Sequence, residues 1–150
     1  MTDEAGATPI PGELDGLALE LIRSAARFTR LAGRVPGVAY SAVAWRVLSD
    51  LEADGPARVS ALAEQQRVAQ PTMTALVQRL EGEGWVVREP DPDDGRATLV
   101  RATPTGLEAL GGYRRAAAGR IRPSLAGLSA DERETLARAA RLMQRLGDGI

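Results

Sequence analysis

Apolar residues recur every three or four positions along most of the chain, which is the spacing of amphipathic helices. Ser60 stands at the expected N-cap of a short third segment, and Ser129 with Glu132 forms a capping box that opens the last one. Four glycines and Pro123 predict that the fifth segment is weak or kinked. The pattern predicts six helices, within residues 13–33, 40–53, 60–66, 70–83, 104–125 and 129–147.

The periodicity changes between residues 85 and 101, where two short runs rich in valine, leucine and threonine predict β-strands. These runs cover residues 85–89 and 97–101, and the polar loop at residues 90–96 is dense in turn formers. The order α-α-α-α-β-β-α-α predicts a mainly helical fold with a small β-hairpin. We expect residues 1–12 to form a flexible tail and residues 13–150 to form a single domain.

Composition excludes several kinds of chemistry. The chain has no cysteine and no histidine, so thiol chemistry, disulfides, zinc fingers and histidine bases are absent. It also has no lysine and no carboxylate pair on a predicted apolar wall, so we expect no enzyme, no metal and no cofactor. The charge-free stretch 35–45 is far shorter than the ~20 residues that span a bilayer. Arg23, the first positively charged side chain, follows five acidic residues, which disfavours a secretory signal and predicts a cytoplasmic protein.

One part of the predicted order has a known physical use. A short helix, a turn at residues 67–69, a longer helix and a hairpin make up the winged helix-turn-helix arrangement. The longer helix fits a major groove ~12 Å wide, and a hairpin can place a basic tip in the minor groove. However, the chain has a net charge of −1, and residues 58–103 hold six arginines against seven acidic residues. A winged-helix module that binds another protein is therefore the alternative.

The sequence of this region specifically resembles the core of the MarR (multiple antibiotic resistance regulator) family. The similar stretches are residues 59–64, 68–81, 84–88, 91–96 and 103–106, the last reading Thr-Pro-Thr-Gly. The resemblance implies a homodimeric transcriptional repressor that binds a pseudo-palindromic double-stranded DNA operator and is released by a small-molecule effector. It also implies a winged helix-turn-helix core at residues 40–103 between dimerisation helices at residues 13–33 and 104–147.

The resemblance assigns roles to single residues. Ser60 and Arg67 would hold phosphates, and Arg96 would enter the minor groove, whose narrow form attracts arginine. Asp94 is expected to orient a neighbouring arginine, and Arg88 has the same wing-orienting role. The DNA-binding face of the recognition helix would comprise Gln70, Pro71, Thr72, Thr74, Gln78 and Arg79. The alternatives are an exposed polar helix face and simple turn chemistry in the acidic loop. Ala69 departs from the family, which usually has serine at this N-cap.

Three of the five aromatic side chains lie on the first two predicted helices. In the family these helices flank a small-ligand pocket, so Phe28, Tyr40 and Trp45 are candidate pocket residues, with Arg46 to neutralise an aromatic carboxylate. Packing in the core is the alternative for the aromatics. Because usual metal and redox ligands are missing, we expect any effector to be a small uncharged or anionic aromatic.

Overall fold

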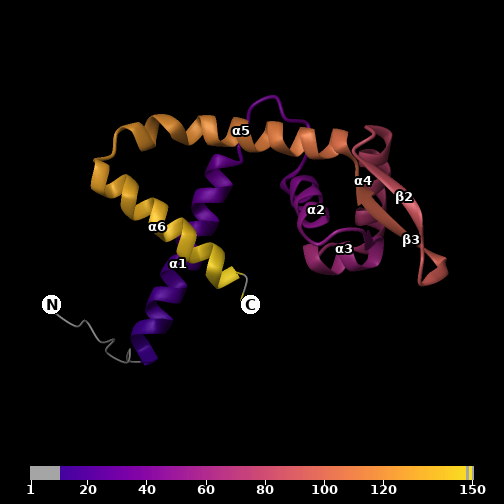
Figure 1. Ribbon diagram of the computed structural model, residues 1–150, viewed down its shortest axis with the longest axis horizontal. Helices are drawn as coiled ribbons and strands as arrows, with labels where there is room; N and C mark the ends of the chain where they lie inside the picture. Colours follow the sequence, from indigo (N-terminus) through magenta and orange to yellow (C-terminus); the bar gives the residue numbers. More distant parts are fainter. Residues whose placement is uncertain (1–10, 148, 150) are drawn as a thin grey trace. The chain divides into compact units, whose positions relative to one another are not determined.

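The computed structural model describes residues 11–147 and residue 149. Most of the predicted tail, residues 1–10, lies outside the described residues. The chain divides into two compact units, residues 1–34 and residues 35–150, whose elements are labelled in Figure 1. The first unit holds helix α1 (Pro11–Ala32), which begins two residues before the predicted start. In the described part of the chain, no helix is both long and apolar enough to cross a membrane.

The second unit has the predicted order of helices and hairpin, with one strand added. Its helices are α2 (Ala42–Ala53), α3 (Val59–Gln66), α4 (Gln70–Gly82), α5 (Pro104–Ala126) and α6 (Ala130–Gly147). Its strands are β1 (Ala57–Arg58), β2 (Val86–Asp91) and β3 (Asp94–Ala102). The arrangement confirms the predicted fold class, a winged helix-turn-helix in which the β2–β3 hairpin is the wing.

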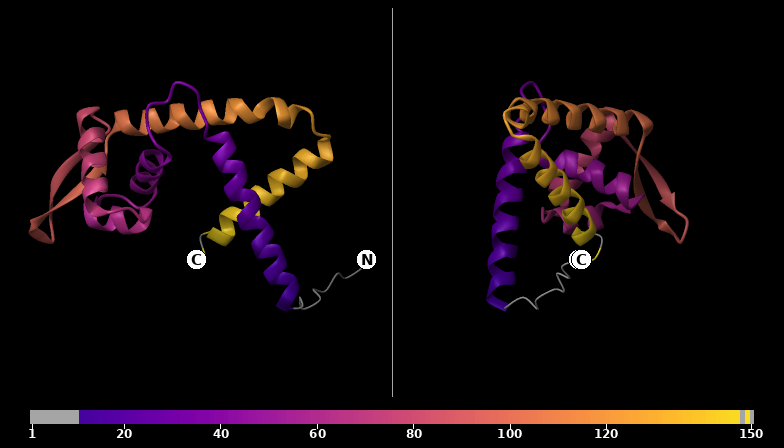
Figure 2. Two further views of the ribbon diagram at one scale, coloured as in Figure 1. Left: turned by 180° about the vertical axis from the view of Figure 1, so that it is seen from behind. Right: turned by 60° about the vertical axis from the view of Figure 1, so that its left-hand side comes forward.

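The three strands form an antiparallel sheet in the order β1-β3-β2. The sequence pattern missed β1 because two residues are too few to show a period of two. Both hairpin strands extend into the loop predicted at residues 90–96, so only Pro92 and Asp93 remain as the turn. In both views of Figure 2 the hairpin projects away from α3 and α4.

One hydrophobic core joins α2, α3, α4, the sheet and α5. Leu48 of α2, Leu62 of α3 and Leu80 of α4 are fully buried, and Val100 of β3 and Leu110 of α5 complete the cluster. Burying a side chain of this size contributes roughly 1.5–3 kcal/mol. Apolar packing therefore fixes the two helices of the helix-turn-helix.

Helix α5 is continuous over its four glycines and Pro123, so the predicted weakness does not interrupt it. Thr103 caps its first turn, because its hydroxyl oxygen accepts the N–H of Gly106 at 3.1 Å. Leu110 then packs into the core, and Arg114 donates hydrogen bonds to two side chains of α2. These tertiary contacts outweigh the low helix propensity of glycine.

The predicted capping box before α6 is also confirmed. The N–H of Glu132 donates to the Ser129 hydroxyl at 3.2 Å, and the N–H of Ser129 donates to the Glu132 carboxylate at 2.7 Å. The backbone hydrogen bond from Ser129 lowers the pKa of the Glu132 carboxyl. Helix α6 therefore has a fixed start, although none of its described side chains is buried.

Candidate nucleic-acid interface

The turn between α3 and α4 closes on backbone hydrogen bonds. The N–H groups of Arg67 and Val68 donate to the carbonyls of Glu64 and Ala63, each at 3.0 Å. Arg67 has a left-handed conformation with φ of 53°, which costs an L-residue roughly 1–2 kcal/mol. The side chain of Arg67 is exposed next to the start of α4. Arg67 therefore sets the direction of α4 and leaves its guanidinium available to a phosphate.

Ser60 is exposed on the second position of α3, and its prediction as the N-cap is wrong. β1 leads directly into α3, so the helix begins at Val59 and Arg58 occupies the cap position. The side chain of Arg58 forms no capping hydrogen bond, because a guanidinium cannot accept the N–H groups of the helix, and it donates to Asp91 of the wing. The phosphate contact expected of Ser60 stays a prediction, and the residue is exposed as that role would need.

A polar network fixes α3 against α2. Arg46 Nε donates to Gln66 Oε1 at 2.6 Å, and Gln66 Nε2 donates to Asp50 Oδ2 at 2.6 Å. The structure thus brings Arg46, a candidate effector residue, to α3. Its contact with Gln66 gives this arginine a structural role in positioning the helix-turn-helix.

Helix α4 begins at Gln70 as predicted, with Pro71 in its first turn and no acidic residue there. The buried side chains Met73, Val77 and Leu80 define its inward face. With 100° per residue, the residues opposite this face, within about 50°, are Pro71, Ala75, Gln78 and Gly82. All four are exposed. The outward face is therefore small and uncharged, with Gln78 as its long polar group.

The other predicted α4 residues lie away from the centre of this face. Thr72 and Thr74 lie to its two sides, and Thr74 is half-buried. Gln70 is exposed, but it falls on the helical stripe of Met73 and Val77, so it is turned away from the outward direction.

Arg79 is engaged by the protein. Its guanidinium carbon lies 4.3 Å from the centre of the Tyr40 ring, a cation–π geometry, and Nη2 donates to the carbonyl of Ala39 at 3.3 Å. These contacts tie the C-terminal half of α4 to the segment before α2. They compete with a DNA-binding role for this arginine.

Four aromatic rings pack together in the second unit. The rings of Trp45 and Tyr113 are stacked with centroids 4.4 Å apart, and Trp85 lies between Trp45 and Tyr40 at 5.3 and 4.6 Å. Trp45 is 8% exposed and belongs to the core. Burial and a hydrogen bond to Glu83, at 2.7 Å, raise the pKa of the Tyr40 hydroxyl. Sequence analysis singled out Tyr40 and Trp45 but missed Trp85 and Tyr113, whose aromatic character was the only signal.

Phe28, the remaining candidate pocket residue, lies on α1 in the other unit and is 53% exposed.

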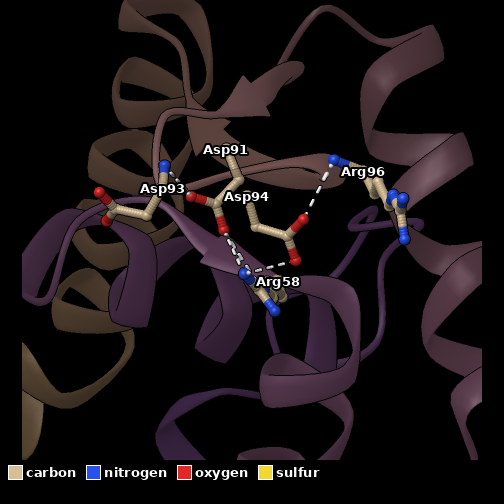
Figure 3. A network of polar contacts seen from close by, with 5 residues as sticks. All are labelled: Arg58, Asp91, Asp93, Asp94 and Arg96. Atoms are coloured by element: carbon tan, nitrogen blue, oxygen red, sulfur yellow. Dashed lines mark hydrogen bonds and ion pairs between the residues drawn. The ribbon is translucent and has the colours of Figure 1, made fainter.

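The wing is held by an ion pair that the sequence analysis did not find. Arg58 Nε and Nη2 lie 3.0 and 2.6 Å from Asp91 Oδ2, and Asp91 is only 7% exposed (Figure 3). The backbone N–H of Asp93 donates to Asp91 Oδ1 at 3.0 Å. The hydrogen bonds from Arg58, and next that from Asp93, hold the pKa of the Asp91 carboxyl below its usual range. In the sequence, the acidic residues of this loop indicated only a turn. Nothing in the sequence pattern indicated that Arg58, far from them along the chain, is their partner.

Arg96 lies in an irregular part of β3. Pro90 pairs with Thr98 and Asp91 pairs with Asp94, so the pairing with β2 skips residues 95–97. A bulge of this kind redirects a side chain. Figure 3 shows the guanidinium of Arg96 turned away from the carboxylates. No described residue forms a hydrogen bond or ion pair with this guanidinium.

The two predicted wing-orienting residues have different surroundings. Asp94 Oδ1 accepts the backbone N–H of Arg96 at 3.2 Å, and Asp94 Oδ2 lies 3.5 Å from Arg58 Nη2. Arg88 Nε lies 3.3 Å from Glu81 Oε2 on α4. The structure therefore brings Asp94 together with Arg96 but takes Arg88 to the recognition helix. Across residues 11–147 and residue 149, no group of acidic side chains could hold a metal ion.

Comparisons with known proteins agree with this geometry. The MarR family matches residues 41–98, from the residue before α2 into β3. An HTH-type transcriptional regulator of Mycobacterium bovis is 36% identical over 133 residues, which cover 88% of this chain and 93% of that protein. The crystal structure of a probable transcriptional regulator from Pseudomonas aeruginosa is 32% identical with a TM-score of 0.55, and covers 85% of this chain and 97% of that one.

A second solved structure extends the agreement in fold. A transcriptional regulator from Thermotoga maritima gives a TM-score of 0.71 at 22% identity, over 89% of this chain and 95% of that one. The relative from Mycobacterium bovis spans both units of this chain and not only the winged core. The chain therefore belongs to the MarR family and is a DNA-binding transcriptional regulator.

Proposed function

We propose that the chain is a homodimeric repressor that binds a pseudo-palindromic operator in double-stranded DNA and is released by a small aromatic molecule. The observation that carries the DNA-binding part is the exposure of two groups on one unit. They are the outward face of α4 and the guanidinium of Arg96, which has no partner among the described residues.

Helix α4 would enter the major groove with its outward face toward the bases. Gln78 can form two hydrogen bonds with adenine, and Ala75 and Pro71 offer apolar contact to a thymine methyl. Thr72 and Thr74 would contact the groove edges. Ala75 is an addition to the DNA face predicted from sequence, whereas the orientation of Gln70 and the contacts of Arg79 favour a lesser role for both.

Ion pairs within the winged core leave its net charge at −1, but they determine which arginines are free to contact DNA. Arg58 neutralises Asp91, Glu89 is paired with Arg101 at 3.1 Å, and Glu81 is paired with Arg88. Arg67 and Arg96 remain for phosphates and the minor groove. Because few basic residues are left, we expect DNA affinity to depend only moderately on salt.

Dimerisation is proposed from the apolar faces of α1 and α6. Large apolar side chains are exposed on both helices, which isolated chains in water rarely tolerate. They are Leu14, Leu17, Leu19, Ile22, Phe28 and Leu31 on α1, and Leu136, Leu142, Met143 and Leu146 on α6. A second copy would cover these faces, so residues 13–33 and 104–147 would serve as dimerisation helices around the core at residues 40–103.

The remaining roles follow from the same assignment. A regulator of this kind would act in the cytoplasm without a catalytic centre. An effector would bind near the aromatic cluster of Tyr40 and Trp45, where Trp85 and Trp45 lie close enough for a bound aromatic to change their fluorescence. A small aromatic acid that changes neither fluorescence nor DNA affinity would argue against that ligand class.

Two measurements test the proposal. Selection from a random duplex library should enrich pseudo-palindromes whose half-sites lie roughly 10 bp apart, because a two-fold dimer presents two recognition helices one helical turn apart. Analytical ultracentrifugation at micromolar concentration should show a dimer. A monomer bound to a single asymmetric half-site would contradict the dimer. Failure to enrich any sequence would favour a winged-helix module that binds another protein.

A further inference from the structure

Arg58 connects the helix-turn-helix to the wing. It is the last residue of β1 and the residue before α3, and its guanidinium contacts the Asp91 carboxylate at the turn of the hairpin. The same guanidinium lies 3.5 Å from Asp94, which accepts the backbone N–H of Arg96. A continuous chain of polar contacts therefore runs from the start of α3 to Arg96 (Figure 3).

The nearly buried carboxylate of Asp91 requires its ion pair with Arg58. A carboxylate that is 7% exposed must have its charge compensated, and hydrogen bonds from a charged donor do this best. Asp91 Oδ2 receives two nitrogens of Arg58, and Asp91 Oδ1 receives the N–H of Asp93. Loss of Arg58 would leave this charge without its partner, and the turn of the wing would have to move to expose it.

Pairing between the strands cannot hold Arg96 in place by itself. Residues 95–97 have no partners on β2, so the position of Arg96 depends on the contacts of Asp91 and Asp94. Arg58 is the side chain that reaches both of them from the helix-turn-helix.

We propose that Arg58 is a positioning residue that fixes the wing so that Arg96 reaches the minor groove. Its guanidinium is committed to Asp91 and does not serve as a phosphate contact. This inference rests on the proposed minor-groove role of Arg96. It makes Arg58 as important for DNA binding as a residue that touches DNA.

A double-mutant cycle tests this role. The full-length protein and the variants Arg58→Ala, Arg96→Ala and Arg58→Ala/Arg96→Ala are compared for affinity to one selected duplex, at several salt concentrations. Arg101→Ala is the matched control, because Arg101 is as exposed as Arg58 (46% for each side chain) and also forms an ion pair in the wing, with Glu89. Thermal unfolding of each variant reports whether the fold is intact.

We expect Arg58→Ala and Arg96→Ala each to lower affinity about tenfold, and the double variant to be no weaker than Arg96→Ala alone. The slope of affinity against salt should fall with either substitution and should not fall further in the double variant. Arg101→Ala should lower affinity less than about twofold. General loss of folded protein would instead add to the effect of Arg96→Ala.

Additive losses, about a hundredfold in the double variant, would overturn the proposal, because Arg58 would then act independently of Arg96. An effect of Arg58→Ala no larger than that of Arg101→Ala would overturn it too. If Arg58→Ala does not fold, Arg58→Lys keeps the charge but loses the two-nitrogen contact. Full affinity in Arg58→Lys would contradict the positioning role. A silent Arg96→Ala would mark failure of the proposed wing function itself.

Discussion

The recognition helix and the wing both face DNA in the proposed complex, but they are held by different forces. Helix α4 is fixed by Met73, Val77 and Leu80, which are fully buried in the core. The wing turn is fixed by the ion pair of Arg58 and Asp91, and half of the Arg58 side chain is in solvent. Apolar packing couples α4 to global stability, whereas the ion pair gives the wing a local hold that pH and salt can weaken.

The largest expected effect distinguishes the apolar packing of α4 from the ion pair of the wing. Met73→Ala should lower the free energy of unfolding by about 2–5 kcal/mol, because it opens a cavity beneath α4. Asp91→Asn should change that free energy much less, while loosening the wing. Urea unfolding of both variants makes the comparison. Equal losses would show that the wing is as tightly coupled to the core as the helix.

The next effect concerns Gly106 of α5, which packs against Trp85, the residue that connects α4 to the wing. A Cβ placed on Gly106 would lie 2.1 Å from the carbonyl oxygen of Trp85, which follows α4 and precedes β2. Gly106→Ala should therefore destabilise by about 1–3 kcal/mol or more, since backbone must shift. Gly119→Ala in the same helix is the control, because its Cβ would meet nothing within 4 Å and should stabilise by about 0.5–1 kcal/mol. A tolerated Gly106→Ala would contradict the close approach.

A smaller effect is expected at the turn before α4. Arg67→Gly should raise the free energy of unfolding by about 1 kcal/mol, because glycine adopts the left-handed conformation without strain. The same change should weaken DNA binding and reduce the salt slope by about one per chain. Unchanged DNA affinity would remove Arg67 from the phosphate contacts, whatever the stability shows.

The smallest change in overall stability should come from acid. The pKa of Asp91 is lower in the folded protein than in the unfolded chain, so its ion pair stabilises the wing above about pH 4. That contribution is lost as the pH falls through the lowered pKa. Hydrogen-exchange protection of wing amides should then fall before that of α4 amides, and Asp91→Asn should lack this dependence. Simultaneous loss of protection in the wing and in α4 would argue that the ion pair does not stabilise the wing separately.

The same contrast explains what could be predicted from sequence. The inward face of α4 repeats with the helical period, so Met73 and Leu80 were identifiable as core from spacing alone. The capping residues Thr103 and Ser129 were identifiable because their partners lie three residues away. Local signals of this kind defined the helices and the hairpin.

The contacts of the wing were beyond such reasoning. Arg58 and Asp91 are 33 residues apart, and the two-residue strand that aligns them has no period to detect. The partner of Arg79 could not be predicted for the same reason, because Tyr40 lies far from it in the sequence and the two meet only in the folded structure. A loop composed of polar turn formers predicts exposed side chains, but the Asp91 carboxylate is buried. Only the tertiary structure therefore identifies Asp91 as a structural residue.

In the proposed complex α4 reads bases, while the wing arginine reads groove shape and potential. The affinities of the unmodified protein, Arg96→Ala and Gln78→Ala for a panel of operator variants, at one salt concentration, distinguish these two roles. Arg96→Ala should weaken binding to every sequence in the panel. Gln78→Ala should relax discrimination at one base pair, with a loss of about 1–3 kcal/mol against the preferred base. Unchanged affinity of Arg96→Ala across the panel would contradict the account and favour a protein-binding role for the winged core.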